Sequence, residues 1–95
     1  MDKKEIISKL EKIEHPAINY SLTKLGILRE INFKKNNVSV VFAFPFPNIP
    51  IADILINSVA DIVKANGLKF QYKTRVMTEK ERESFLRLET EAWKG

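Results

Sequence analysis

Few side chains in this 95-residue chain have the type and spacing that catalysis or metal binding requires. The sequence contains no cysteine and a single histidine, His15. Disulfides, thiolate metal sites and cysteine nucleophiles are therefore excluded, and a cluster of histidine ligands within one chain is implausible. His15 has no nucleophile or second histidine near it in the sequence, so we interpret it as a helix-ending residue held by Pro16. We expect no enzyme activity, no resident cofactor and no metal site.

The most informative segment is Phe46-Pro47-Asn48-Ile49-Pro50, which follows an apolar strand pattern and precedes a helical pattern. Its prolines stop strand pairing, and Asn48 is a suitable cap for the following helix. The alternative is an anion-binding turn at the helix start, although Pro50 removes one of the amide donors such a site would use. Phe46 either continues the inward register of the strand or is an exposed docking residue.

Basic residues suggest a different class of function. Lys69, Lys73 and Arg75 alternate along a predicted strand, and the chain carries 16 Lys and Arg against 12 Asp and Glu, a net charge of +4. This excess permits nucleic-acid binding without demanding it. Proteins that bind single strands stack bases on exposed aromatic side chains, whereas Phe70 and Tyr72 are predicted on the opposite, buried face. A nucleic-acid interface at the three basic residues is therefore the alternative hypothesis.

The elements that position these residues are predicted from hydrophobic periodicity and from turn signals. Asp2 with Glu5 indicates the start of a first helix, and His15-Pro16 is expected to end it. Lys35-Asn36-Asn37 indicates the turn of an antiparallel hairpin, and Asn66-Gly67 the end of a central helix. The expected helices are 3–13, 51–64 and 79–93, and the expected strands are 27–33, 38–44 and 68–76.

The ends of the chain carry two further predictions. Thr78 and Glu81 have the spacing of a capping box, which starts the last helix. Trp93, near the end of that helix, either pins it to the core or is a docking residue. The alternating Glu and Lys or Arg residues between Glu79 and Glu91 are typical of a solvated helix face.

Together these elements predict an α+β fold, a two-layer sandwich in which a three-stranded mixed sheet carries N- and C-terminal helices. The sheet is a hairpin followed by a strand-helix-strand unit, and we expect its second and third strands to be parallel. We expect one domain over residues 1–95, because a chain of this length supports a single modest core. The start of the sequence resembles no signal peptide, so we expect a cytoplasmic protein.

Three segments, in this order, resemble the iron-sulfur cluster assembly domain family. They are His15-Pro16-Ala17-Ile18, then Leu22-Thr23-Lys24-Leu25-Gly26-Ile27-Leu28, and then Phe46-Pro47-Asn48-Ile49-Pro50 with Asp53. The family includes SufT-like and PaaD-like proteins and the N-terminal domain of Mrp/ApbC-type carriers. It commonly has an acidic residue where this chain has Lys24, and a Pro-x-Cys-Pro motif whose cysteine position is Ile49 here.

The resemblance implies an accessory or adaptor role in iron-sulfur cluster assembly or delivery. A P-loop iron-sulfur cluster carrier, or another assembly component, is the partner it implies, and Lys24, Phe46, Asn48, Ile49 and Asp53 are the partner-contact residues. Cluster iron is held chiefly by thiolates. Because isoleucine supplies no ligand, we expect the isolated protein to act by docking without holding a cluster. A homodimer through the hairpin edge or the terminal helices is also possible.

Overall fold

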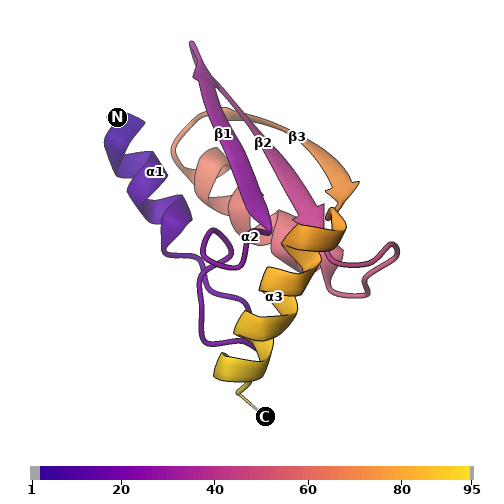
Figure 1. The fold of residues 1–95 in the computed structure, drawn as a ribbon. Helices are drawn as coiled ribbons and strands as arrows, with labels where there is room; N and C mark the ends of the chain where they lie inside the picture. Colours follow the sequence, from indigo (N-terminus) through magenta and orange to yellow (C-terminus); the bar gives the residue numbers. More distant parts are fainter. Residues whose placement is uncertain (1–2, 95) are drawn as a thin grey trace.

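The computed structural model describes residues 3–94, and it has three helices and three strands (Figure 1). In chain order these are α1 (Lys3–Glu11), β1 (Leu28–Lys34), β2 (Asn37–Phe44), α2 (Ala52–Ala65), β3 (Lys69–Val76) and α3 (Glu79–Ala92). Each predicted element is present, so the α+β prediction is confirmed. None of the helices in the described part of the chain has both the length and the apolar character that a membrane crossing requires.

The sheet has the order β1-β2-β3, with β2 in the centre. β1 and β2 are antiparallel and form the expected hairpin, in which Leu28 pairs with Phe42. β2 and β3 are parallel, in register from the pair Asn37 and Lys69 to the pair Phe44 and Val76. The prediction of a parallel strand-helix-strand unit is therefore confirmed, and α2 is its crossover.

The hydrophobic core lies between the sheet and the helices that cover one of its faces. Alternate residues of β2 point into it, and α2 supplies the facing side chains because its apolar residues recur at helical spacing. Phe42 is fully buried and stacks on Phe44, whose predicted core position is confirmed. The buried side chains of these two elements are Val38, Val40, Phe42, Ala43, Phe44, Leu55, Ile56, Val59, Ala60 and Val63.

Two helix ends match their turn signals differently. α2 ends at Ala65 and is followed by Gly67 at φ 75°, a left-handed conformation that glycine adopts without strain, as the Asn66-Gly67 pair predicted. α1 ends at Glu11, two residues before the predicted end and well before His15-Pro16. The proposed cap Asp2 lies outside the described residues.

The second face of the sheet is open, as predicted, and carries exposed Lys69, Gln71, Lys73 and Arg75 from β3. The expected burial of the opposite side of β3 is wrong in part. Phe70 is half-buried, but Tyr72 retains 49% exposure and Val76 retains 45%. The reason is that β3 is an edge strand, so within residues 3–94 its side chains have a neighbouring strand on one side alone.

Candidate functional site

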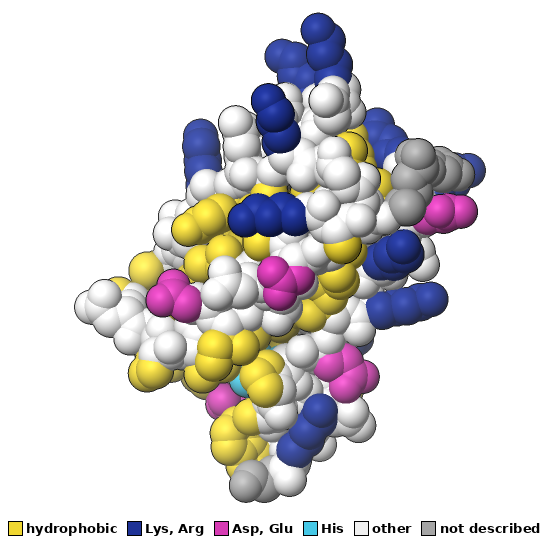
Figure 2. Space-filling model, turned by 180° about the vertical axis from the view of Figure 1, so that it is seen from behind, with side chains coloured by type: hydrophobic (Ala, Val, Ile, Leu, Met, Phe, Trp, Pro, Cys, Tyr) yellow, Lys and Arg dark blue, Asp and Glu magenta, His cyan; other side chains and the backbone are white. Residues whose placement is uncertain are grey.

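An apolar cavity of about 320 Å³ lies beyond the carboxyl ends of β2 and β3, where the turn into α2 meets α3. Ligands of open α/β sheets commonly bind beyond the carboxyl ends of the strands. Figure 2 shows hydrophobic side chains (yellow) gathered around the histidine (cyan) in the lower part of the view. The residues that line the apolar cavity are His15, Ala17, Ile27, Phe44, Pro45, Phe46, Ile49, Ile51, Leu55, Phe85, Glu89 and Trp93.

The turn between β2 and α2 forms one wall of the apolar cavity. Asn48 has φ 58°, a left-handed conformation that asparagine tolerates better than most residues. α2 begins after Ile51, and no side chain caps it, so the prediction that Asn48 caps this helix is wrong. The turn is closed by the backbone: the Ala52 N–H donates to the Ile49 carbonyl at 3.1 Å. Ile49 is half-buried and packs against the core.

His15 lies in the opposite wall and is 7% exposed. Its Nδ1 accepts a hydrogen bond from the Ala17 N–H at 3.0 Å, which leaves the proton of the neutral ring on Nε2. Burial, and then the nearby charge of Lys94, lower the pKa of His15. Both effects favour the neutral imidazole. The backbone of the same segment is also fixed, because the His15 N–H donates to the Tyr20 carbonyl at 3.1 Å.

The rim of the apolar cavity contains two large exposed aromatic side chains. Trp93 is 55% exposed and Phe46 is 48% exposed. The backbone beside Trp93 is anchored, since Ile18 and Trp93 form an isolated antiparallel bridge. Phe46 lies under the guanidinium of Arg82, whose Cζ is 5.6 Å from the ring centroid. The structure therefore places the Trp93 side chain at the rim and not in the core, while its role as a docking residue stays a prediction.

The donor set of the apolar cavity does not fit cluster ligation. Its polar side-chain groups are the imidazole of His15, the carboxylate of Glu89 and the indole N–H of Trp93, while iron-sulfur clusters are held chiefly by thiolates. Within residues 3–94 no three His, Cys, Asp or Glu side chains are grouped so that they could hold a metal ion. What the cavity offers chemically is apolar contact area, aromatic faces and these few polar groups.

The structure brings four of the five predicted contact residues together. Phe46, Asn48, Ile49 and Asp53 all line a second depression, the strand-edge hollow, of about 440 Å³ between the β2–α2 turn and β3. Its other lining residues are Phe44, Pro47, Ala52, Thr74, Arg75 and Val76. Lys24 lies apart: it is exposed, and its ammonium sits 5.9 Å from the Tyr20 ring centroid.

Most residues that line the apolar cavity were not predicted from the sequence as contact residues, and His15 and Phe85 are two examples. His15 was interpreted as a helix-ending residue. Its place in a segment that carries the family resemblance was the one sequence signal that could have marked it as part of the site. Phe85 belonged only to an apolar helix stripe, and nothing in its local pattern marks it as a cavity wall. Both reach the apolar cavity through packing between segments far apart in the chain.

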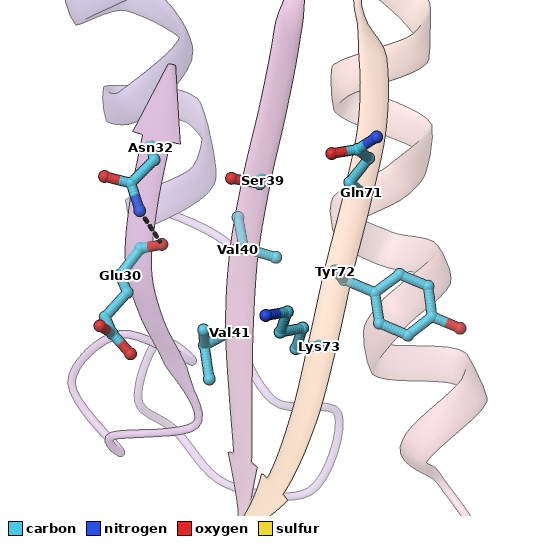
Figure 3. Close-up of a pocket in the computed structure, with 8 residues that line it drawn as sticks. All are labelled: Glu30, Asn32, Ser39, Val40, Val41, Gln71, Tyr72 and Lys73. Atoms are coloured by element: carbon cyan, nitrogen blue, oxygen red, sulfur yellow. Dashed lines mark hydrogen bonds between the residues drawn. The ribbon is translucent and has the colours of Figure 1, made fainter. Parts of the chain in front are cut away.

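The basic residues of β3 lie elsewhere, on the open sheet face. Figure 3 shows Lys73 beside Val41, while the Tyr72 ring points away from this face. Arg75 is bound to Glu81 through two hydrogen bonds of 2.8 and 3.0 Å, and Arg29 Nη1 lies 3.3 Å from the same carboxylate. The three basic residues are thus on one face, as predicted, but one of them is largely neutralised by a partner.

Comparison with known proteins supports the family suggested by the sequence. The family described as iron-sulfur cluster assembly protein matches over residues 3–69, which is most of the chain. A search of curated proteins found none that matches. A solved structure, the crystal structure of a domain of unknown function (DUF59) from Bacillus anthracis, has the same fold. It superposes with a TM-score of 0.62 at 15% identity, covering 90% of each chain. The chain belongs to the iron-sulfur cluster assembly protein family, in a variant without the family cysteine.

Proposed function

We propose that this protein is an accessory or adaptor component of iron-sulfur cluster assembly or delivery that works through protein contacts and does not itself hold a cluster. It acts in the cytoplasm and without enzyme activity. SufT-like and PaaD-like proteins are the family members that it is proposed to resemble. The family membership supports the pathway in this proposal, and the apolar cavity supports the mode of action.

The observation that carries the proposal is the composition of the apolar cavity at the family's cysteine position. Ile49 stands there among aromatic and aliphatic side chains, and Trp93 and Phe46 stay exposed at the rim. Binding energy at protein interfaces is concentrated in a few buried aromatic or aliphatic anchors that fill such pockets. An anchor side chain of a partner, seated between Ile49 and Trp93, would cover apolar surface that water now contacts.

The partner that the family resemblance suggests is a P-loop iron-sulfur cluster carrier. Contact between a carrier and the motif position would let the protein orient the carrier or its recipient without supplying a ligand. Phe46, Asn48, Ile49 and Asp53 are the contact residues in this proposal, since they lie together on the β2–α2 turn and the first turn of α2. Lys24 is a separate, secondary contact because it lies away from that turn.

Titration calorimetry with the P-loop cluster carrier of the same host tests the proposal. Removing the Trp93 indole by Trp93→Ala is expected to weaken binding by about 2 kcal/mol, roughly thirtyfold, as for a hot-spot aromatic. Ile54→Ala is the matched control, because Ile54 is 56% exposed on α2 and does not line the apolar cavity. No binding by the wild-type protein, or equal loss in both variants, would contradict the adaptor role at this site.

Anaerobic reconstitution with iron and sulfide tests the second half of the proposal. The wild-type protein is expected to gain no stoichiometric visible absorbance, because its cavity offers no thiolate. A stoichiometric cluster on the purified protein would refute docking without ligation. The calorimetric test of binding to the carrier would still decide the adaptor role.

Nucleic-acid binding at Lys69, Lys73 and Arg75 remains the alternative function. Two observations weaken this alternative. The Arg75–Glu81 pair reduces the positive charge available to phosphates. Tyr72 is the one aromatic residue among those that line the depression on the open face, so stacked bases would have little aromatic surface there. Binding to single-stranded RNA that falls steeply between about 50 and 200 mM salt, and falls further in Lys73→Glu, would favour it.

A further inference from the structure

The outer edge of β3 has no strand paired with it in the described part of the chain. Within residues 3–94, β3 pairs with β2, and β1 occupies the other edge of the sheet. The β1 edge is irregular, because its register shifts between Arg29 and Asn32 and Glu30 has φ 50°. Bulges of this kind protect an edge from further pairing. β3 has no such irregularity over its eight residues.

Two hydrogen bonds establish which backbone groups of β3 face the free edge. The Lys69 N–H donates to the Asn36 carbonyl at 2.8 Å, and the Met77 N–H donates to the Phe44 carbonyl at 2.7 Å. Backbone groups of successive strand residues point alternately to the two sides of the strand. The odd-numbered residues of β3 therefore bond toward β2. The N–H and C=O groups of Phe70, Tyr72, Thr74 and Val76 point outward.

The side chains of these same four residues lie on the inner face of the sheet, and Tyr72 and Val76 are the large hydrophobic residues among them that stay exposed. Tyr72 is 49% exposed and Val76 is 45% exposed, although Tyr72 rests edge-on against the buried Phe42. The strand-edge hollow opens beside Thr74 and Val76 on this face. An added strand would thus find apolar surface and a depression for alternate side chains, the two features that give specificity in strand addition.

The outer face of the same edge is positively charged. Lys69 and Lys73 are exposed, and neither forms an ion pair with any residue in the range 3–94. An added strand lies about 4.8 Å away, so its outward side chains would neighbour these lysines. Opposite charges at such cross-strand positions are stabilising and like charges are destabilising.

This charge pattern decides between two occupants of the edge. A second copy paired antiparallel through β3 would place the lysines of both chains on one face of the joined sheet, where they repel. We propose that the β3 edge binds an extended peptide segment of a partner protein by strand addition, with acidic residues alternating with apolar ones. The acidic residues face Lys69 and Lys73, and the apolar residues cover Tyr72 and Val76. This inference goes beyond the proposed function: it shares the strand-edge hollow with the proposed contact residues, but it concerns the backbone edge of β3 and requires no cluster-assembly partner.

The test uses the full chain and a fluorescent eight-residue peptide of alternating glutamate and valine. We expect saturable binding at about 50 mM salt, at least tenfold weaker binding of a lysine and valine peptide, and loss of that preference in Lys73→Glu. If no binding is detected up to about 1 mM peptide, a concentration at which even a very weak complex would form, the proposal is overturned. Equal binding of the two peptides would overturn it as well.

A proline substitution separates strand addition from attraction to a charged surface. Thr74→Pro removes an outward N–H and leaves the bonds to β2 in place, so the peptide is expected to bind at least tenfold more weakly. Thr74→Val is the matched control, because it keeps the N–H and a β-branched side chain, and it should bind within twofold of wild type. Equal binding by Thr74→Pro and Thr74→Val would overturn the proposal.

Hydrogen exchange on the wild-type protein gives a reading that does not depend on the folding of a variant. The peptide is expected to slow exchange of the Tyr72 and Thr74 amides at least tenfold and to leave the Lys73 amide, already bonded to β2, unchanged. Unchanged exchange at Tyr72 and Thr74 would overturn strand addition. Slow exchange of the Tyr72 and Thr74 amides without peptide, together with a dimeric mass in solution, would show that a second copy pairs with the β3 edge. That result would also overturn the peptide proposal.

Discussion

Helices α2 and α3 both begin just beyond the carboxyl ends of the parallel strands, but different interactions hold the two starts. At α3, the Thr78 hydroxyl accepts from the Glu81 N–H at 3.2 Å, and the Glu81 carboxylate accepts from the Thr78 N–H at 2.8 Å. At α2, no side chain caps the first turn. Leu55 in that turn is 1% exposed and reaches the core.

The difference shows how one small domain separates stability from recognition. The start of α3 is held by polar bonds between residues three apart, extended by Arg75 and Arg29 on the carboxylate. The start of α2 is held by burial, so the exposed residues of its turn have no capping duty. That turn carries Phe46 and Asn48, and the first turn of α2 carries Asp53; the proposed function assigns all three to partner contact.

The largest expected effect comes from removing the packing that holds the start of α2. Leu55→Ala is expected to cost about 2–5 kcal/mol in the free energy of unfolding, as for other buried leucines. Urea unfolding followed by circular dichroism measures it. The neighbouring Ile54→Ala, at a 56% exposed position, should change stability by no more than about 0.5 kcal/mol. Equal losses in the two variants would remove the contrast between the helix starts.

Breaking the polar start of α3 should cost less. Thr78→Ala removes the acceptor for the Glu81 N–H and is expected to lower the free energy of unfolding by about 1 kcal/mol. Thr78→Ser keeps the hydroxyl and should retain most of that stability. The same denaturation experiment on Thr90→Ala, an exposed threonine later in α3, is the control, with a change within about 0.5 kcal/mol. A Thr78→Ala variant as stable as wild type would show that α3 too is held by packing.

A pH titration probes the same network through Glu81. Hydrogen bonds from Arg75 and from the Thr78 N–H lower its pKa from 4.5 to about 2. Between these values the unfolded carboxyl binds more protons than the folded one, so the Glu81 contribution is present above about pH 4.5 and is lost as the pH falls toward about 2. Unfolding midpoints measured across this range should decline less steeply in Glu81→Gln than in wild type.

The control for the pH experiment is Glu83→Gln, which removes one exposed carboxylate of the same helix outside this network. It should keep the wild-type decline over the range. If the two variants behave alike, the decline reflects the net charge of the protein and not the bonds to Glu81.

The smallest expected effect sharpens the account of the α2 turn. Asn48 has φ 58° and makes no capping bond to α2, so its backbone conformation and not its side-chain oxygen should matter. Asn48→Gly is expected to change the free energy of unfolding by no more than about 0.5 kcal/mol, while Asn48→Ser should cost about 1 kcal/mol. Differential scanning calorimetry of the two variants measures the difference. A capping residue would show the reverse order, because serine caps as well as asparagine does.

The start of α3 illustrates what can be read from the sequence. Thr78 and Glu81 are three residues apart, and their bonding requires only that the intervening backbone be helical, so the capping box was predictable and is confirmed. The hairpin and the end of α2 at Gly67 were predictable for the same local reason. Asn48 has equally suitable chemistry for a cap, but the turn path set by the prolines and the packing of Ile49 places it elsewhere.

The candidate site depended less on local pattern. The family position of Ile49 was readable in the sequence, whereas its meeting with His15 and Trp93 was not, since these residues are separated by dozens of positions and meet only through packing. Likewise the pairing of Arg75 with Glu81 joins a strand to the helix that follows it. The stripe of basic residues gave no indication that one member was already engaged.

The sequence by itself determined the elements, their order, the absence of a thiolate and the family, because these follow from residue type and from spacing along the chain. Tertiary structure alone decided which surfaces are covered. Tyr72 and Val76 have the same alternation as the buried residues of β2, yet they remain exposed because β3 lies at the edge of the sheet and β2 in its centre. Burial depends on what segments distant in the chain cover, and hydrophobic periodicity reports only which face an element offers.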